Sequence, residues 1–271
     1  ENIKTVHYVS PSLWAYREKR IHKVKRAVDL MLTLFPFETA VYEQHGVAVK
    51  CVGHPLADSL GFEDHKLRSR KKFDLGADDS IVTLMPGSRG GEIKRLAPVF
   101  LNAAVQSLTD CPNLKFLIPY SSAANYAQIN ALLREMSLFR GERFILVDDS
   151  HGAISAADLV VLSSGTATLE TLLLRRPMIV GYKLAAITFA IASRLVKIPY
   201  VALPNLLAGR QLVPEYIQHD LTAAKVRDGI VSHISGAEDH AGLMLEFEKI
   251  HRSLRLDASA QAAAAVAGLI E

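Results

Sequence analysis

The sequence predicts an α/β protein built on parallel β-sheets, and three observations support this class. Short β-branched or apolar runs alternate with helical patterns through most of the 271 residues, as in sheets whose strands are joined by right-handed helical crossovers. The hydrophobic fraction of 49% is enough to fill a substantial core. Two of the apolar runs end in glycine and small hydroxyl residues just before a helical pattern begins, which is typical of a strand-to-helix turn.

Eight runs have the length and composition of strands. In chain order they lie at residues 5–9, 30–35, 47–52, 81–85, 114–119, 144–147, 159–162 and 178–181. Helices are expected between them, near residues 13–27, 38–45, 91–108, 123–136 and 166–175. After Tyr200 the strand signal fades, and helices are expected near residues 211–219, 222–234 and 237–253 and from Ser259 onward.

Charge and turn residues suggest how the chain divides. The stretch 61–80 is charged and poor in apolar residues, so we interpret it as a linker. It separates residues 1–60, expected to be the end of one parallel-sheet domain, from a second such domain at 81–205, and residues 206–271 are expected to be C-terminal helices. The chain begins at Glu1 and enters a strand almost at once, so we expect a preceding portion in the whole protein.

Composition excludes several classes of protein. The two cysteines, Cys51 and Cys111, are far apart and belong to no C-x-x-C pair, which indicates neither a zinc site nor a disulfide framework. Uncharged apolar stretches such as 184–193 are too short to span a bilayer. The formal net charge is +3, but residues 17–26 alone carry six basic side chains against Glu18, so the positive charge is local.

The two glycine-containing turns predict an anion site. Gly87, Ser88 and Arg89 follow the strand 81–85, and Ser164-Gly165-Thr166 follows the strand 159–162. Ligands of open parallel sheets bind beyond the carboxyl ends of the strands, where helix N-termini direct backbone N–H groups at anions. Neither turn has the spacing G-x-x-x-x-G-K-[ST] or G-x-G-x-x-G, so neither of the two common nucleotide motifs is present.

Two charged residues narrow the ligand to a nucleoside diphosphate. The Arg89 guanidinium can hold a diphosphate through two hydrogen bonds. The carboxylate of Glu170, one turn into the second helix, would repel phosphate and suits the two ribose hydroxyls. The alternative is that both turns are ordinary strand-to-helix connections and that Glu170 is an exposed helix residue. The joint occurrence of both turns with Arg89 and Glu170 favours the binding site.

The chemistry expected of this site uses no metal and no cofactor. A reaction that releases a nucleoside diphosphate leaves negative charge on the departing group. We expect Arg89 and the amides near Thr166 to stabilise that charge. The sequence has no Asp-x-Asp pair placed to hold a divalent ion beside the diphosphate.

Five ordered blocks resemble lipid-A-disaccharide synthases. They are YVSPSLWAYREKRIHKVKRAVDLMLTLFPFE, CVGHPLADSL, MPGSRGGEIKRLAPVF, ADLVVLSSGTATLETLLLRRPMIVGYK and LVKIPYVALPNLLAGRQLVPEYIQ. The resemblance covers nearly the whole chain and implies a two-domain GT-B glycosyltransferase, with Rossmann-like parallel sheets flanked by helices and with C-terminal helices. Such an enzyme transfers 2,3-diacylglucosamine from its UDP donor to lipid X, 2,3-diacylglucosamine 1-phosphate, and releases UDP.

The resemblance also assigns roles to individual residues. Substrate-binding positions are implied at both turns, at the ribose-facing carboxylate and in the block PNLLAGR: Gly87, Ser88, Ser164, Gly165, Thr166, Glu170, Asn205 and Arg210. Arg89 is implied as the residue that stabilises the diphosphate leaving group. The general base is implied to be an acidic residue that precedes Glu1, so none of these 271 residues is assigned that role. Asn205 could instead belong to a turn after Pro204, and His54 is expected in a turn rather than in the cleft.

The partners implied are UDP-diacylglucosamine, lipid X, the phospholipid surface of the inner membrane on its cytoplasmic face, and a second copy of the chain that exchanges C-terminal helices. Nucleic acid is not expected, because aromatic residues are not interleaved with the basic ones. Two stretches are membrane candidates. They are 17–26, which could be only a solvated helix face, and 184–196, which could pack in the core.

Two other functions stay open from the sequence. One is another GT-B enzyme that uses a UDP-sugar, such as an epimerase or a peptidoglycan glycosyltransferase, although the block PNLLAGR disfavours both. The other is a UDP-binding and dimerising module without turnover, as expected if the base lies outside this chain.

Overall fold

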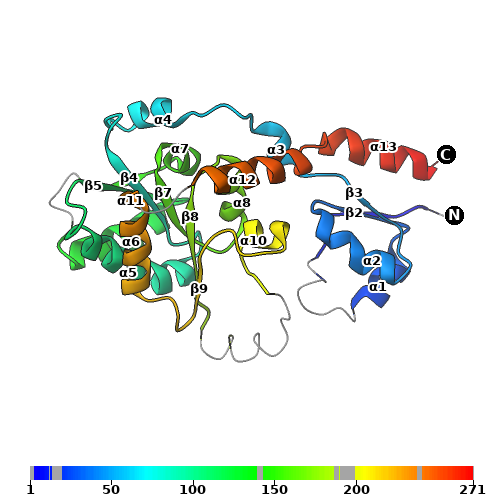
Figure 1. Ribbon diagram of the computed structural model, residues 1–271. Coiled ribbons are helices and arrows are strands. Elements are labelled where there is room, and N and C mark those ends of the chain that lie inside the picture. The colour runs from blue at the N-terminus through cyan, green and yellow to red at the C-terminus, as the bar shows by residue number, and fades with distance from the viewer. Residues whose placement is uncertain are drawn as a thin grey trace. The chain divides into compact units, whose positions relative to one another are not determined.

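The computed structural model describes residues 3–11, 13, 20–138, 143–185, 189, 199–236 and 240–270 (Figure 1). Its contacts divide the chain into two compact units. The first unit comprises residues 1–61, 186–199 and 248–271, and the second unit comprises residues 62–185 and 200–247. The stretch 61–80, interpreted above as a linker, thus falls almost entirely within the second unit, and the C-terminal stretch 206–271 is shared between the two.

A three-stranded parallel sheet forms the centre of the first unit. Its strands β1 (Val6–Tyr8), β2 (Leu30–Thr33) and β3 (Val49–Cys51) lie in the order β1-β2-β3. The connections contain the helices α1 (Ile21–Ala27), η2 (Pro36–Glu38) and α2 (Thr39–Gln44). The three strands predicted in this part of the sequence are therefore confirmed.

The described core of this unit consists of Leu13, Ile21, Met31, Val41, Tyr42 and Val47. Val24 and Val28 pack against it, so with Ile21 they form an i, i+3, i+7 apolar face that packs on the core. The basic side chains Lys23, Lys25 and Arg26 on α1 are exposed. Residues 14–19, which contain the rest of that membrane candidate, lie outside the described residues, as does most of the candidate 184–196.

The C-terminal helices return to the first unit through α3 (Pro55–Ser59). The Asp58 carboxylate accepts hydrogen bonds from the backbone N–H groups of Asp257 at 3.0 Å and Ala258 at 2.7 Å, at the start of α13 (Ala258–Ile270). Carboxylates stabilise helix N-termini in this way. His54 begins α3, where its Nδ1 accepts a bond from Leu56 N at 3.1 Å. Burial lowers its pKa. His54 was expected in a turn and instead caps the start of a helix.

The second unit is built on a six-stranded parallel sheet in the order β6-β5-β4-β7-β8-β9. The strands are β4 (Ser80–Met85), β5 (Leu114–Pro119), β6 (Phe144–Val147), β7 (Leu159–Ser163), β8 (Met178–Tyr182) and β9 (Glu215–Ile217). From β4 the chain moves outward through β5 to β6, then returns to place β7 on the other side of β4. The strand order therefore reverses between β4 and β7, which is where open parallel sheets bind ligands.

Helices cover both faces of this sheet. Alternate residues of a strand point to opposite faces. Val82 and Leu84 thus join the core under α5 (Gly90–Ser107), α6 (Ala123–Glu135) and α11 (Ala223–Ile234), while Ile81 joins a second core under α7 (Ser150–Ala156). A sheet buried on both faces explains why these strands read as continuous apolar runs.

The strand β9 corrects one prediction. A helix was expected near 211–219, but Glu215, Tyr216 and Ile217 pair in parallel with Val180, Gly181 and Tyr182 of β8. The sequence EYI is not an apolar run, and the pairing with β8 decides its conformation. The helix α10 (Leu203–Ala208) precedes this strand and ends at Gly209, whose φ of 65° is the left-handed conformation favoured at helix ends.

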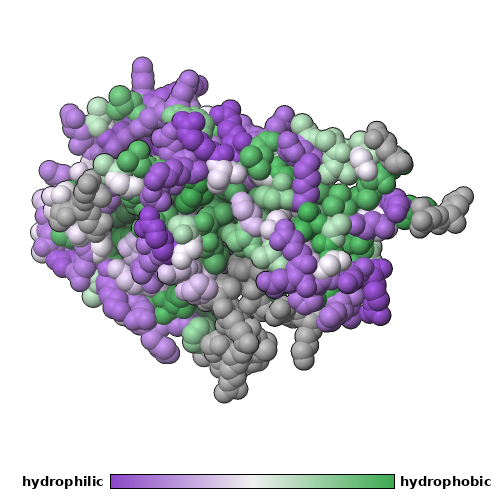
Figure 2. Space-filling view, turned by 45° about the vertical axis from the view of Figure 1, so that its right-hand side comes forward, coloured by the Kyte–Doolittle hydropathy of each residue, from purple (hydrophilic) through white to green (hydrophobic). Residues whose placement is uncertain are grey.

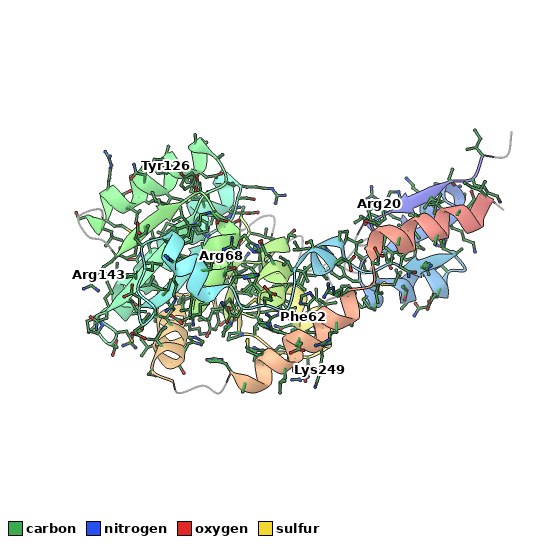
Figure 3. The ribbon with its side chains drawn as sticks, turned by 90° about the horizontal axis from the view of Figure 1, so that it is seen from above. Arg20, Phe62, Arg68, Tyr126, Arg143 and Lys249 are labelled. Carbon is green, nitrogen blue, oxygen red and sulfur yellow. The ribbon has the colours of Figure 1, made fainter. Side chains whose placement is uncertain are left out.

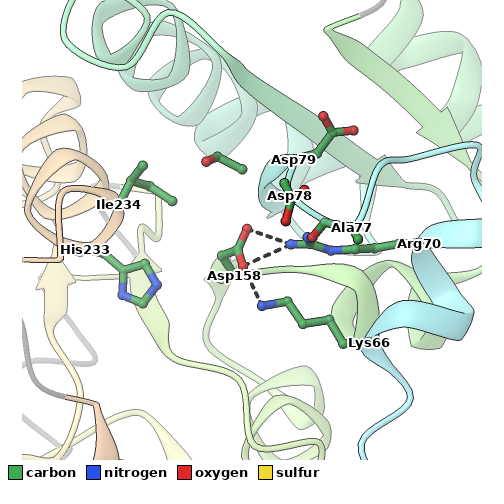
Figure 4. Close-up of a pocket in the computed structure, with 9 residues that line it drawn as sticks. Lys66, Arg70, Ala77, Asp78, Asp79, Asp158, His233 and Ile234 are labelled. Atoms are coloured by element: carbon green, nitrogen blue, oxygen red, sulfur yellow. Dashed lines mark hydrogen bonds and ion pairs between the residues drawn. The ribbon is translucent and has the colours of Figure 1, made fainter.

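The helix α4 (Lys66–Lys72) shows why the charged stretch is not a linker. The Arg70 side chain is only 4% exposed and donates to Ala156 O at 3.0 Å, to Ala77 O and to both oxygens of Asp158 at 2.9 and 2.8 Å. Asp158 also accepts from Ile81 N and from Lys66 Nζ (Figure 4). The charges that suggested a solvated linker thus fix α4 to the amino end of the sheet.

Candidate functional site

A cavity of about 430 Å³ lies at the reversal point of the second sheet. Both predicted turns line it, the first after β4 and the second after β7, together with Glu170. The carboxyl ends of β5 and β6 contribute Pro119, Tyr120 and Asp148 to the same wall. The two sequence motifs, almost eighty residues apart, therefore meet in one cavity, which we name the donor cavity.

The first turn brings the backbone close to its own helix. Gly87 has a φ of 114°, and a Cβ atom there would stand 2.5 Å from Glu92 Oε2, so no other residue fits without strain. Arg89 is the residue before α5, and its side chain is 84% exposed at the cavity rim. Glycine and an exposed guanidinium together leave this turn open to an anion.

Glu92 is a residue of the donor cavity that sequence reasoning missed. Its carboxylate accepts a hydrogen bond from Arg89 Nη1 at 3.1 Å. Burial raises the pKa of the Tyr182 phenol, and the Glu92 charge raises it further, whereas Arg89 and Arg95 oppose the shift. The signal that could have identified Glu92 is its i, i+3 spacing from Arg89.

The second turn presents the N-terminus of α8 (Thr166–Leu173) to the donor cavity. No atom lies within 4 Å of where a Cβ on Gly165 would stand, so the backbone here is unobstructed. Ser164 Oγ donates to Val201 O at 2.7 Å, and Thr168 Oγ1 donates to Gly165 O at 2.7 Å. Ser164 N donates to Gly181 O at 3.2 Å, so the amides of this turn that stay available to a ligand are those of Gly165 and Thr166.

Glu170 lines the donor cavity and is not a solvated helix residue. Its side chain is 22% exposed, and its Oε1 lies 3.0 Å from Nδ1 of His151 on α7. Sequence reasoning missed His151, because α7 was not predicted and the two residues are nineteen positions apart. The imidazole therefore restrains one oxygen of the Glu170 carboxylate.

Asn205 and Arg210, implied by resemblance to contact substrate, do not line the donor cavity. Asn205 is fully buried, and all its amide atoms are bonded within the protein: Nδ2 donates to Val213 O and Glu215 Oε1, and Oδ1 accepts from Leu212 N and Val213 N. Arg210 forms an exposed ion pair with Glu246 at 3.1 Å. Direct substrate contact by either residue stays a prediction.

The bonds of Asn205 give it a positioning role. Glu215, which it holds at 2.7 Å, accepts from the backbone N–H groups of Val201 and Ala202 at 2.9 Å, and Val201 O is the acceptor of Ser164. A continuous hydrogen-bonded chain thus leads from buried Asn205 to the second turn of the donor cavity.

Replacing Asn205 by alanine is expected to lower the free energy of unfolding by about 3 kcal/mol, because it leaves two buried N–H groups and one Glu215 oxygen without this partner. Denaturant unfolding followed by circular dichroism measures the change. Asn102→Ala is the control, since that exposed side chain bonds only Pro98 O, and about 0.5 kcal/mol or less is expected. Equal losses in both variants would contradict the positioning role.

The described residues contain no group of three or more His, Cys, Asp or Glu side chains placed to hold a metal ion. None of the described helices is long and apolar enough to cross a membrane.

Solved structures with the same architecture are glycosyltransferases and related UDP-sugar enzymes. A pneumococcal O-GlcNAc transferase, solved with UDP and GlcNAc, has a TM-score of 0.55 at 12% identity, covering 93% of this chain and 47% of its own. A glycosyltransferase involved in lipopolysaccharide biosynthesis has a TM-score of 0.54 at 12% identity, covering 96% of this chain and 74% of its own. The fold is therefore of the GT-B type, as predicted.

The family follows from the sequence comparisons. The model of the lipid-A-disaccharide synthetase family matches residues 1–267, so the chain belongs to this family. A lipid-A-disaccharide synthase of Pseudomonas aeruginosa is 48% identical over 270 residues, which are 99% of this chain and 70% of that protein. The chain is therefore a hexosyltransferase of lipid A biosynthesis, and the resemblance noted in the sequence is confirmed.

Proposed function

We propose that the donor cavity binds the UDP moiety of UDP-2,3-diacylglucosamine and that the glucosamine unit passes to lipid X, with release of UDP. The observation that carries this proposal is the convergence of the two turns and Glu170 in one cavity at the sheet reversal. A UDP-sugar donor and a lipid acceptor are the substrate classes that the family implies. The rival readings, a UDP-sugar epimerase or a peptidoglycan glycosyltransferase, have no support from the family match.

In this proposal the diphosphate lies between the two turns. The exposed Arg89 guanidinium faces it from one side and the amides at the start of α8 face it from the other. As the glycosidic bond to the diphosphate breaks, negative charge grows on the leaving oxygen. A positioned donor that strengthens with this charge contributes about 2.7–4 kcal/mol to transition-state stabilisation. Arg89 is therefore proposed as the catalytic residue of this chain.

Glu170 is proposed to accept hydrogen bonds from the two ribose hydroxyls. Its carboxylate lies in the cavity wall four residues after Thr166, so it is near the phosphate end but not among the anion-binding amides. His151 restrains it at 3.0 Å. A carboxylate can accept hydrogen bonds from two hydroxyl groups. Removing its charge would leave both ribose hydroxyls without a strong acceptor.

Glu170→Gln is expected to weaken UDP binding by about tenfold and 2′,3′-dideoxy-UDP binding by less than about threefold, because only UDP has the hydroxyls. Calorimetric titration of both ligands measures the two losses. Glu135→Gln, an exposed change on α6, serves as the matched control and should alter neither affinity. Equal losses for UDP and the dideoxy analogue would refute the ribose contact.

The proposal includes a general base, a membrane contact and a dimer. It assigns no residue of this chain to any of the three. We propose that the enzyme acts as a homodimer at the cytoplasmic face of the inner membrane and needs neither metal nor cofactor. The chain spans about 70% of the length of the Pseudomonas relative, and no residue of it is proposed as the base. A second candidate function is UDP binding and dimerisation without turnover. The observation that favours it is that all lining residues of the donor cavity belong to the second unit, so this unit alone supplies the proposed UDP site.

A further inference from the structure

A second cavity of about 520 Å³ lies between α4 and α7 in the second unit. It shares no lining residue with the donor cavity. Its wall consists of His65, Arg68, Ser69, Lys71, Lys72, Asp149, His151, Gly152 and Ser155. We name it the α4–α7 cavity; Arg68, one of its lining residues, is labelled in Figure 3. In the space-filling view the upper surface, where α4 lies, is mainly hydrophilic (Figure 2).

Positive charge dominates the lining of the α4–α7 cavity. Arg68, Lys71 and Lys72 are exposed cations, and Asp149 is the only carboxylate in the wall. Lys72 pairs with Asp149 at 2.7 Å. Burial opposes ionisation of Asp149, but bonds from Gly152 N and Lys72 outweigh it, so its pKa lies below the ordinary value. Among the described side chains, neither Arg68 nor Lys71 has an acidic partner.

The wall also holds a buried hydroxyl without a partner. Ser155 is 2% exposed and lines the α4–α7 cavity, and its Oγ forms no hydrogen bond with any described residue. Buried hydroxyl groups are nearly always bonded, so an unsatisfied one requires an explanation. A ligand oxygen in the cavity would satisfy it.

We propose that the α4–α7 cavity binds a phosphate group, carried by a lipid headgroup or by a soluble phosphate compound. The Arg68 guanidinium and the Lys71 ammonium, one helical turn apart on α4, supply charge-assisted donors, and Ser155 supplies a neutral one from α7. Phosphate is favoured over a nucleic acid because the wall has no Phe, Tyr or Trp side chain, the usual stacking platforms for bases. The site stands independently of the donor cavity, since no lining residue is common to both.

Calorimetric titration of the chain with inorganic pyrophosphate tests the site. The donor cavity is blocked in two ways, by saturating UDP and, in a separate titration, by Arg89→Ala. Binding is expected in both, and Arg68→Gln/Lys71→Gln is expected to weaken it by at least about tenfold. The control Lys94→Gln/Arg227→Gln removes the same charge from α5 and α11 and should change it by less than about twofold. Binding that the Arg68/Lys71 variant leaves unchanged would overturn the proposal.

Ser155→Ala separates a ligand contact from a structural role. Because its hydroxyl has no partner in the protein, the alanine variant is expected to keep its melting temperature and to bind pyrophosphate at least about threefold more weakly. A lower melting temperature with unchanged binding would contradict the assignment.

Vesicle sedimentation distinguishes the two phosphate sources. Retention on phosphatidylglycerol vesicles but not on phosphatidylcholine vesicles, lost in Arg68→Gln/Lys71→Gln, identifies a lipid phosphate. Pyrophosphate binding without vesicle retention identifies a soluble phosphate compound. Absence of both would overturn the site.

Discussion

Replacing Arg89 by alanine is expected to weaken UDP binding to this chain by about a hundredfold, and to lower turnover of the complete enzyme at least as much. The guanidinium is the exposed cation of the first turn and lies in the wall of the donor cavity. Its loss removes a bidentate donor from the diphosphate. Calorimetry with UDP measures the first effect, and an assay of disaccharide formation measures the second.

The ion pair between Arg89 and Glu92 does not prevent this role. The pair is solvent-exposed at the Arg89 end, and exposed pairs contribute only about 0–1 kcal/mol, so a diphosphate can displace the carboxylate. Arg134→Ala, an exposed change on α6, is the matched control and should leave UDP affinity unaltered. UDP affinity and turnover within about threefold of the unmodified protein would remove Arg89 from the mechanism.

Replacing Asp158 by alanine is expected to lower the free energy of unfolding by about 3–5 kcal/mol. The change leaves the buried Arg70 guanidinium without its carboxylate and Ile81 N without its acceptor (Figure 4). The loss of the bond to Lys66 adds little, since that side chain is 32% exposed. Denaturant unfolding followed by circular dichroism measures the loss.

Asp228→Ala is the control for this change, because that carboxylate is 65% exposed and pairs only with Arg227. Less than about 1 kcal/mol is expected there. If Asp158→Ala cost no more than Asp228→Ala, the network at the amino end of the sheet would not hold α4 in place.

Local patterns predicted most of the fold because eight of its strands lie in apolar or β-branched runs that alternate with helical patterns. The elements that were missed are short or depend on partners far along the chain. β9 has three residues and forms by pairing with β8, and α7 is rich in small residues with no clear amphipathic period. α4 was interpreted as part of a linker because its sequence is charged; Asp158, the partner of its buried Arg70, lies 88 residues away and could not be identified from the local sequence.

The residues of the candidate site also differ in how far the local sequence reveals them. Gly87 and Gly165 were identifiable because a turn that presents its backbone needs glycine locally, and Arg89 stands directly beside one of them. Asp148 lines the donor cavity, and His151 contacts Glu170 in its wall. Both positions follow from the order of the strands in the sheet, which no local sequence pattern specifies. Asn205 was expected at the substrate, but its amide is saturated inside the protein, a property of burial that its turn-like sequence does not reveal.

The most direct test of a metal-free UDP site is a calorimetric titration of this chain with UDP in the presence of EDTA, beside the same titration with uridine. The proposal predicts that UDP binds with EDTA present and that uridine, which lacks the diphosphate, binds at least about a hundredfold more weakly. A folded chain that binds no UDP, or that binds it only when a divalent cation is supplied, would contradict the account.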